Sequence, residues 1–193
     1  MNIGYSTRAL AGEVVCGDMG GWWIQPQRTV FALADGIGHG VAAHHAASCA
    51  MECISRHLHR SCAELFMACN EALRKTRGAV LAIAVVDAVT NVMTLVSMGN
   101  IRTIVCSGLR QNRLSTERGI VGACLQAPQV QEIVLTPGDM VLMYSDGLDE
   151  WTKLSACFDD ADPSPQRLAE RILARWAIER DDASIFIYRH TVV

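Results

Sequence analysis

The order of strand-like and helix-like segments limits the possible folds of this chain more than any other feature. Three strand-like segments lie at residues 2–10, 22–25 and 29–33, and two helical segments follow within 41–78. Strands return between residues 80 and 144, and one helix then precedes an alternating strand at 183–188. Because strands and helices are grouped rather than alternating, we predict an α+β fold of antiparallel sheets with helices on their faces. A doubly wound parallel sheet is disfavoured.

Capping residues mark where the helices begin. Residues 41–59 place small and apolar side chains at helical spacing, which predicts the first helix. Ser61 followed by Glu64 is the pattern of a capping box and predicts the start of a second helix. Before the last helix, Ser164 is a candidate N-cap, and Pro165 suits the first helical position.

The middle of the chain alternates between apolar runs and turn residues. This pattern predicts consecutive strands at residues 80–86, 92–97, 101–106, 131–135 and 140–144. Residues 110–129 are polar and irregular, so we expect a loop there with some local structure.

Composition narrows the class of protein. The chain has 193 residues, which favours a single domain spanning residues 1–193. Hydrophobic residues make up 50% of the chain and charged residues 19%, so it can bury enough surface to exclude intrinsic disorder. The net charge of −3 gives no basic excess for a phosphate backbone, and we expect no nucleic-acid partner.

Neither a membrane span nor an export signal is visible in the sequence. The most apolar stretch, residues 79–98, is interrupted by Asp87 and Asn91, whereas a span needs about 20 predominantly apolar residues. Residues 1–11 lack the long apolar run of a secretion signal. We therefore expect a cytoplasmic protein with no membrane contact, whose eight cysteines are mostly buried free thiols.

The first predicted helix also carries His44, His45, Cys49 and Cys53, which raises the alternative of a zinc site. Tetrahedral zinc needs four converging ligands, and neither a CxxC nor an HExxH spacing is present. We interpret the two cysteines as part of a packed helix face.

Acidic residues stand where apolar segments run out into loops. Asp35 and Asp146 each end an apolar run and precede a glycine, and Asp18 follows a glycine. Asp181 and Asp182 precede the last strand. Any one Asp-Gly pair can be an ordinary turn. Carboxylates that converge from several strand ends would repel one another unless cations bind, and an all-oxygen ligand set suits Mg²⁺ or Mn²⁺.

Several short motifs follow one another along the chain. They are ADGIGHG at 34–40, LTPGD at 135–139 with YSDGLDE at 144–150, and RDDAS at 180–184. Gly17-Asp18 and Met98-Gly99-Asn100 add two weaker matches. In this order the set resembles the signatures of metal-dependent PP2C-type serine/threonine phosphatases, in their bacterial SpoIIE-like branch. The resemblance covers nearly the whole chain.

The resemblance implies two stacked antiparallel β-sheets flanked by helices, an α-β-β-α sandwich with a metal centre at one edge. It implies that the Asp35 carboxylate bridges two metal ions and that the Gly36 carbonyl binds one of them. Asp146 and Asp181 would hold the other. Asp18 would support an additional, weaker ion or the water shell. The implied cofactors are therefore two Mn²⁺ or Mg²⁺ ions, with a third site at Asp18.

The implied reaction needs no cysteine nucleophile. A water activated between two divalent cations would attack phosphorus while the Ser or Thr oxygen leaves, so Asp35, Asp146 and Asp181 would act through that water. His39 lies in the motif at 34–40, which we call the metal loop. It could bind a metal ion or give a proton to the leaving oxygen, and it could equally brace the loop. The sequence does not separate Asp181 from Asp182.

The branch also implies partners. Its short, stand-alone members reset stressosomes, so the implied substrates are phosphoserine and phosphothreonine on STAS-domain proteins of a stressosome. Eukaryotic relatives hold phosphate with an N-terminal arginine, for which Arg8 is the candidate here; residues 110–118 or the partner protein are alternatives. Two other functions stay open: a catalytically weak binding module that docks on phosphorylated partners, and a small-molecule phosphatase.

Overall fold

Two five-stranded antiparallel sheets form the centre of the described part of the chain. The computed structural model describes residues 2–108, 110–123, 128–148 and 164–191. Sheet A has the strand order β1 (Ile3–Arg8), β10 (Ala183–Arg189), β9 (Met140–Tyr144), β6 (Arg102–Ser107), β7 (Arg110–Arg113). Sheet B has the order β2 (Asp18–Gln25), β3 (Arg28–Gly36), β4 (Ala79–Asp87), β5 (Val92–Met98), β8 (Gln131–Val134). The predicted α+β class with antiparallel sheets is confirmed.

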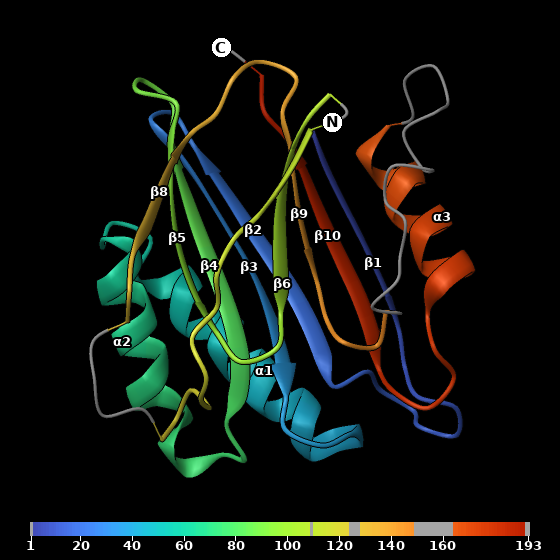
Figure 1. Cartoon of the computed structure of the whole chain (residues 1–193). Coiled ribbons are helices and arrows are strands. Elements are labelled where there is room, and N and C mark those ends of the chain that lie inside the picture. The colour runs from blue at the N-terminus through green and yellow to red at the C-terminus, as the bar shows by residue number, and fades with distance from the viewer. Residues whose placement is uncertain (1, 109, 124–127, 149–163, 192–193) are drawn as a thin grey trace.

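Helices cover the outer faces of both sheets, which gives the layers α-β-β-α (Figure 1). Helices α1 (Gly40–Arg56) and α2 (Cys62–Ala72) pack on sheet B, and α3 (Pro165–Trp176) packs on sheet A. A short 3₁₀ turn, η1 (Leu73–Lys75), follows α2. The predicted sandwich of two stacked sheets is therefore the observed one.

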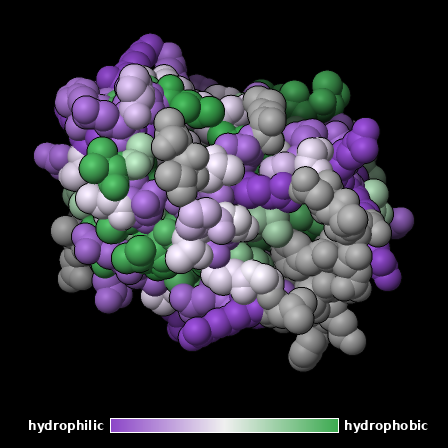
Figure 2. Space-filling model, turned by 90° about the horizontal axis from the view of Figure 1, so that it is seen from above, coloured by the Kyte–Doolittle hydropathy of each residue, from purple (hydrophilic) through white to green (hydrophobic). Residues whose placement is uncertain are grey.

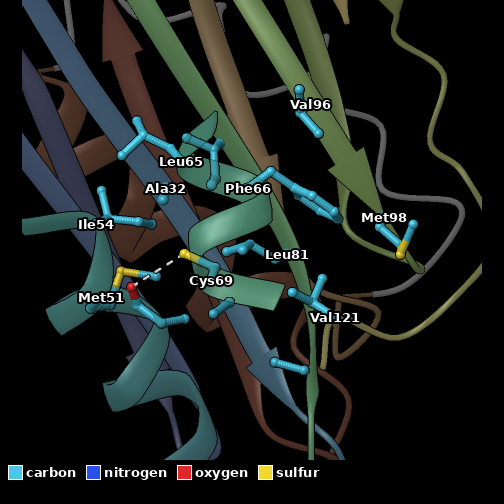
Figure 3. Packing of buried hydrophobic residues seen from close by; sticks show 14 of the residues in the cluster. Ala32, Met51, Ile54, Leu65, Phe66, Cys69, Leu81, Val96, Met98 and Val121 are labelled. Carbon is cyan, nitrogen blue, oxygen red and sulfur yellow. Dashed lines mark hydrogen bonds between the residues drawn. The ribbon is translucent and has the colours of Figure 1, made fainter. Parts of the chain in front are cut away.

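Buried apolar side chains fill the space between the layers. Among the described residues they form one cluster under α1 and α2, one between the sheets and one under α3. Figure 3 shows the first cluster, in which Leu65 and Phe66 of α2 and Met51 and Ile54 of α1 surround the interior over Ala32 of β3. Strands β3 and β4 are apolar along almost their whole length because they are covered on both faces, by helices and by sheet A.

Small residues let α1 approach the sheet closely. Ala43, Ala46, Ala47 and Ala50 are all fully buried on one side of the helix. An alanine stripe brings the helix backbone near the strands, so the loop that joins β3 to α1 is held tightly at the end of sheet B. The ADGIGHG motif spans the end of β3, this loop and the first residue of α1.

The capping predictions are confirmed. Ser61 accepts a hydrogen bond from the Glu64 backbone, and the Glu64 carboxylate accepts one from the Ser61 backbone, which completes the capping box of α2. Ser164 accepts from the backbone of Arg167 at the start of α3, with Pro165 as the first helical residue.

Three boundaries differ from the predictions. The first helix ends at Arg56 rather than at 59, and the predicted loop 110–129 begins with strand β7. Strand β2 starts at Asp18 rather than at residue 22, because Asp18–Gly21 pairs with β3 although Met-Gly-Gly has no strand pattern. Pairing with an apolar neighbour overrides weak local propensity here.

The surface shows no sign of a helical membrane anchor within the described ranges. None of their helices combines the length and apolar character that crossing a bilayer requires. On the face drawn in Figure 2, hydrophilic and hydrophobic side chains are interspersed.

Candidate metal centre

Strand pairing places two carboxylates opposite each other. Asp18 begins β2 and Asp35 stands next to the end of β3, and the antiparallel register pairs their Cα atoms. Like charges directly opposite on neighbouring strands destabilise a sheet. The pair therefore has a cost that an ordinary turn would not require.

Two further carboxylates come from the ends of sheet A. Asp146 follows β9 and Asp181 precedes β10, and these two strands are neighbours. All three of Asp18, Asp146 and Asp181 lie close enough to act electrostatically on Asp35. The fold thus brings together four of the five aspartates that the sequence singled out, from strand ends of both sheets.

Burial and mutual repulsion disfavour the charged forms of these groups. Burial, followed by the charges of Asp18, Asp146 and Asp181, raises the pKa of Asp35 to about 9. Burial raises the pKa of Asp18 to about 6, against hydrogen bonds that lower it. Burial and Asp146 also raise the pKa of Asp181. A site of this kind favours positive charge from a ligand.

Only one of the two carboxylate oxygens of Asp18 has described hydrogen-bond partners. Its Oδ2 accepts hydrogen bonds from Ser145 Oγ at 2.6 Å and Ser184 Oγ at 2.7 Å. Its Oδ1 is buried, and no described residue hydrogen-bonds to it. Buried acceptors are normally satisfied, so this oxygen fits a cation or a cation's water. Sequence reasoning missed both serines as positioning residues, although Ser145 and Ser184 stand inside two of the motifs.

Glycines allow close backbone approach around the acidic cluster. A Cβ on Gly36 would lie 2.0 Å from the carbonyl oxygen of Ala43 in α1, and one on Gly147 would lie 1.9 Å from that of Asp182. Gly38 has a φ of 89°, a left-handed conformation that glycine adopts readily. The glycines of the motifs are therefore required by packing and chain direction, whether or not the Gly36 carbonyl binds a metal.

The two adjacent aspartates have different surroundings. Asp182 is 3% exposed, and its carboxylate accepts from the backbone of Leu10 at 2.8 Å and of Gly17 at 2.9 Å. Asp181 is half-buried, and Asp146 acts on it electrostatically. Asp182 therefore holds the segment before β2 in place. Asp181 is the one of the two that joins Asp18, Asp35 and Asp146 in the acidic centre.

Asp146 and His39 each have a partner. Asn100 donates from Nδ2 to Asp146 Oδ2 at 2.7 Å, which gives the weaker motif around Asn100 a positioning role. His39 occupies the N-cap position of α1, and its Nδ1 pairs with the Glu13 carboxylate. The charge of His39 also acts on Asp181. Sequence reasoning missed Glu13, which has no motif around it.

Two arginines near the acidic centre differ in what their guanidinium groups contact. The Arg8 guanidinium donates to the Ile178 carbonyl, so the N-terminal candidate is engaged by the backbone. Arg77 has an Nη1 that would stand 3.0 Å from a Cβ on Gly38, next to the metal loop. Neither sequence pattern nor spacing pointed to Arg77.

The acidic side chains suit divalent cations by their chemistry, although those that the structure describes do not surround an ion position. Within the described ranges, no three Asp, Glu, His or Cys side chains stand close enough together to enclose an ion. That holds for the zinc alternative at His44, His45, Cys49 and Cys53 as well as for the aspartates. What favours Mg²⁺ or Mn²⁺ is the all-oxygen donor set, its repulsion and the unsatisfied Asp18 oxygen.

Comparisons with known sequences point to one family. The chain matches the family model for Stage II sporulation protein E (SpoIIE) over residues 25–191. Phosphoserine phosphatase RsbX of Bacillus subtilis (strain 168) is 22% identical over 139 residues, which cover 72% of this chain and 70% of RsbX.

Solved structures share the fold. A chain described with the bacterial stressosome, a modular system adapted to control secondary messenger signaling, is 28% identical with a TM-score of 0.91, covering 97% of this chain and 98% of its own. RsbX in complex with magnesium is 19% identical with a TM-score of 0.85, and the match covers 96% of this chain and 92% of the RsbX chain. The PP2C phosphatase domain of SpoIIE from Bacillus subtilis is 19% identical with a TM-score of 0.82, and the match covers 98% of this chain and 63% of the SpoIIE chain.

The fold and these relatives define a protein phosphatase of PP2C type. Within that class, the chain belongs to the SpoIIE family, whose model it matches over most of its length. The predicted family, the predicted fold and the predicted class of enzyme are confirmed.

Proposed function

We propose that this chain is a metal-dependent phosphatase that hydrolyses phosphoserine and phosphothreonine on STAS-domain proteins of a stressosome. The observation that carries the proposal is the convergence of four aspartates from the strand ends of both sheets. The 28% identical chain described with the bacterial stressosome and the similarity to the phosphoserine phosphatase RsbX support the pathway. A stressosome role would place the protein in the cytoplasm.

The residues that would hold the cofactors follow from the site. Asp35, the Gly36 carbonyl, Asp146 and Asp181 would hold two Mn²⁺ or Mg²⁺ ions. Asp18 would support a third, weaker ion through its unsatisfied Oδ1. The RsbX structure with magnesium supports a divalent cation. When bound, such a pair of cations supplies an activated water and neutralises charge on the phosphoryl oxygens.

Asn100, Ser145 and Ser184 would keep the acidic side chains in position. Asn100 fixes one oxygen of Asp146, and the two serines fix one oxygen of Asp18. The other oxygen of Asp18 has no described hydrogen-bond partner and can face a ligand. Positioning of this kind reduces the ordering required when the substrate binds.

His39 would hold a proton near the leaving oxygen. Glu13 pairs with its Nδ1 and fixes the orientation of the ring. With Nδ1 engaged, the second ring nitrogen, Nε2, is the one that could give a proton to the departing Ser or Thr oxygen.

Arg77 would hold the phosphate. Its guanidinium lies against Gly38, and the Ile37 backbone N–H donates to the Gly78 carbonyl at 3.0 Å. That bond fastens the metal loop to the segment that carries Arg77. A guanidinium matches the geometry of phosphate oxygens, and Arg77 forms no ion pair with a described carboxylate.

Exposed apolar side chains beside the loop favour a protein substrate over a small molecule. Val14 is 94% exposed and Val41 is 74% exposed. They adjoin Glu13 and Gly40, and the Glu13 carboxylate would stand 2.5 Å from a Cβ on Gly40. A docked protein surface would cover both valines, whereas a small phosphate ester would leave them in water.

The proposal is tested with a phosphorylated STAS-domain protein and the full chain. Mass spectrometry follows loss of phosphate with Mn²⁺ present, and Asp35→Asn serves as the inactive control. Multiple-turnover loss of phosphate supports the phosphatase. Tight binding without turnover would favour the binding module, and turnover of p-nitrophenyl phosphate alone would favour a small-molecule phosphatase.

A further inference from the structure

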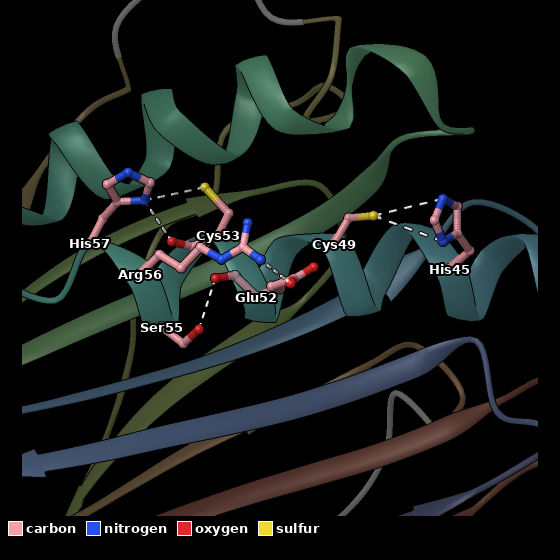
Figure 4. A network of polar contacts seen from close by, with 7 residues as sticks. All are labelled: His45, Cys49, Glu52, Cys53, Ser55, Arg56 and His57. Atoms are coloured by element: carbon pink, nitrogen blue, oxygen red, sulfur yellow. Dashed lines mark hydrogen bonds and ion pairs between the residues drawn. The ribbon is translucent and has the colours of Figure 1, made fainter.

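A groove of about 460 Å³ lies between α1 and α2, away from the acidic centre. Its lining includes Cys49, Cys53, His57 and Arg60. Figure 4 shows that the two cysteines follow each other along α1, each with a histidine beside it. The proposed phosphatase chemistry uses none of these residues, so the groove raises a separate question.

Cys53 faces a hydrogen-bond donor and positive charge. The His57 Nδ1 lies 2.8 Å from the Cys53 carbonyl oxygen and 3.8 Å from the Cys53 Sγ (Figure 4). Because a carbonyl can only accept, Nδ1 carries the proton, and the same N–H edge faces the sulfur. Arg60 adds charge from the end of the groove.

The third neighbour of Cys53 is a second thiol. Cys69 on α2 is fully buried in the cluster against which Cys53 packs, and the two thiols are close enough to shift each other's pKa. Figure 3 shows the Cys69 sulfur directed toward α1, where it contacts the Ala50 carbonyl at 3.7 Å. The Cys53 thiol thus lines the groove, and the buried Cys69 thiol lies behind it.

The two groove cysteines differ in acidity. The neighbouring Cys69 side chain, and then His57 and Arg60, lower the pKa of Cys53 to about 6, against burial. Burial and the charge of Glu52 raise the pKa of Cys49, one helical turn earlier. Thiolate character governs reactivity toward oxidants, so Cys49 is a matched control from the same surface.

We propose that Cys53 is a site of reversible oxidation by peroxides and that Cys69 resolves it into a disulfide that joins α1 to α2. The groove gives a small peroxide access to Cys53, and Cys69 is the buried thiol beside it, since its sulfur faces α1 at Ala50 and Cys53 packs against the same cluster. The proposal does not depend on the phosphatase activity.

The chemistry balances with hydrogen peroxide as the oxidant. The Cys53 sulfur attacks one peroxide oxygen, an S–O bond forms, the O–O bond breaks, and the thiol proton leaves with the other oxygen as water. The Cys69 sulfur then attacks the Cys53 sulfenic acid, an S–S bond forms, and hydroxide leaves with the Cys69 proton as a second water. Two thiols lose two electrons and two protons, and the peroxide is reduced.

The test uses the full chain in EDTA, treated with hydrogen peroxide and then alkylated. Cleavage after Arg and Glu isolates Cys53 on residues 53–56 and Cys69 on 65–71, apart from Cys49 and Cys62. We expect these two peptides to be linked, and the link to disappear with dithiothreitol. In Cys69→Ser we expect Cys53 to be trapped by dimedone as a sulfenic acid.

A rate comparison tests the same proposal without the disulfide. At pH 7 we expect iodoacetamide to alkylate Cys53 about fivefold faster than Cys49, since the larger thiolate fraction outweighs its lower nucleophilicity. Cys53→Ser, at a half-buried position, should remove the fast phase, and Cys49→Ser should keep it. Faster alkylation of Cys49, or a peroxide-induced link that omits Cys53 or Cys69, would overturn the proposal.

Discussion

Asp18 and Asp35 oppose each other on neighbouring strands, a placement that destabilises an ordinary sheet. Their surroundings do little to remove the conflict, because the hydroxyls of Ser145 and Ser184 reach only one oxygen of Asp18. A local arrangement that opposes stability is expected at functional sites. We therefore attribute both carboxylates to the work of the site rather than to the stability of the fold.

Asp35→Asn tests this at a single residue. It removes one charge from a crowded set with almost no change in volume. We expect turnover to fall by about a hundredfold or more, because Asp35 would hold both cations. The Tm without cations should stay nearly the same at neutral pH, because the raised pKa of Asp35 already keeps this carboxyl protonated there. Steady-state kinetics and thermal melts measure both, and near-wild-type turnover at saturating Mn²⁺ would contradict the bridging role.

The neighbouring aspartates should separate in two measurements. Asp182→Asn replaces an acceptor of the Leu10 and Gly17 backbone bonds, so we expect a loss of about 1–3 kcal/mol of stability. Asp181→Asn should leave the Tm nearly unchanged and remove turnover. If Asp181→Asn melts early while Asp182→Asn only loses activity, the two roles are reversed.

At the scale of elements, the end of β3 and the start of α1 form one packed unit. The absence of a side chain at Gly36 lets the α1 backbone at Ala43 lie against the strand. That contact fixes where the loop between Asp35 and Gly40 can run. The position of the acidic centre therefore depends on the packing of a helix as well as on strand register.

Gly36→Ala should disturb this unit. Its methyl group would lie 2.0 Å from the Ala43 carbonyl, so we expect a loss of about 1–3 kcal/mol or more from overpacking. Gly12→Ala is the control, with nothing within 4 Å of its Cβ; its positive φ costs about 1–2 kcal/mol. Urea unfolding compares the two, and equal stability of Gly36→Ala and wild type would show that α1 can shift without cost.

The sequence predicted most elements because their signals are local. Apolar alternation and caps such as Ser61 and Ser164 need only neighbouring residues to be recognised. Strand β7 was missed because Arg110–Arg113 is polar and each of its residues is exposed, and only its pairing with β6 makes it a strand. The beginning of β2 was missed for the same reason.

The site was predictable where function is written into short motifs and not where tertiary contacts decide it. The four aspartates stood in or beside recognisable motifs. The bond from Ser184 to Asp18 joins residues 166 positions apart, and that from Ser145 spans 127. The side chains of Glu13 and Arg77 lie against the metal loop although both residues are remote from it in the sequence. Such contacts follow from how two sheets stack, which no local pattern encodes.

At the scale of the whole molecule, the proposed substrate is another folded protein. Remote surface contacts contribute binding energy that positions the phosphate, and a short peptide lacks them. We expect kcat/KM for an intact phosphorylated STAS domain to exceed that for a peptide from the same site by about tenfold or more, which is about 1.4 kcal/mol of transition-state binding. Equal values would mean that the active site alone selects its substrate.

The need for divalent cations is the central claim, and one rate measurement tests it directly. The chain is freed of metal with EDTA, and release of phosphate from a phosphoprotein is followed before and after Mn²⁺ or Mg²⁺ is added in excess of the chelator. We predict no turnover in EDTA and full recovery with the added ion, since the clustered carboxylates supply oxygen ligands and no nucleophile. Undiminished phosphate release in excess EDTA would contradict the account.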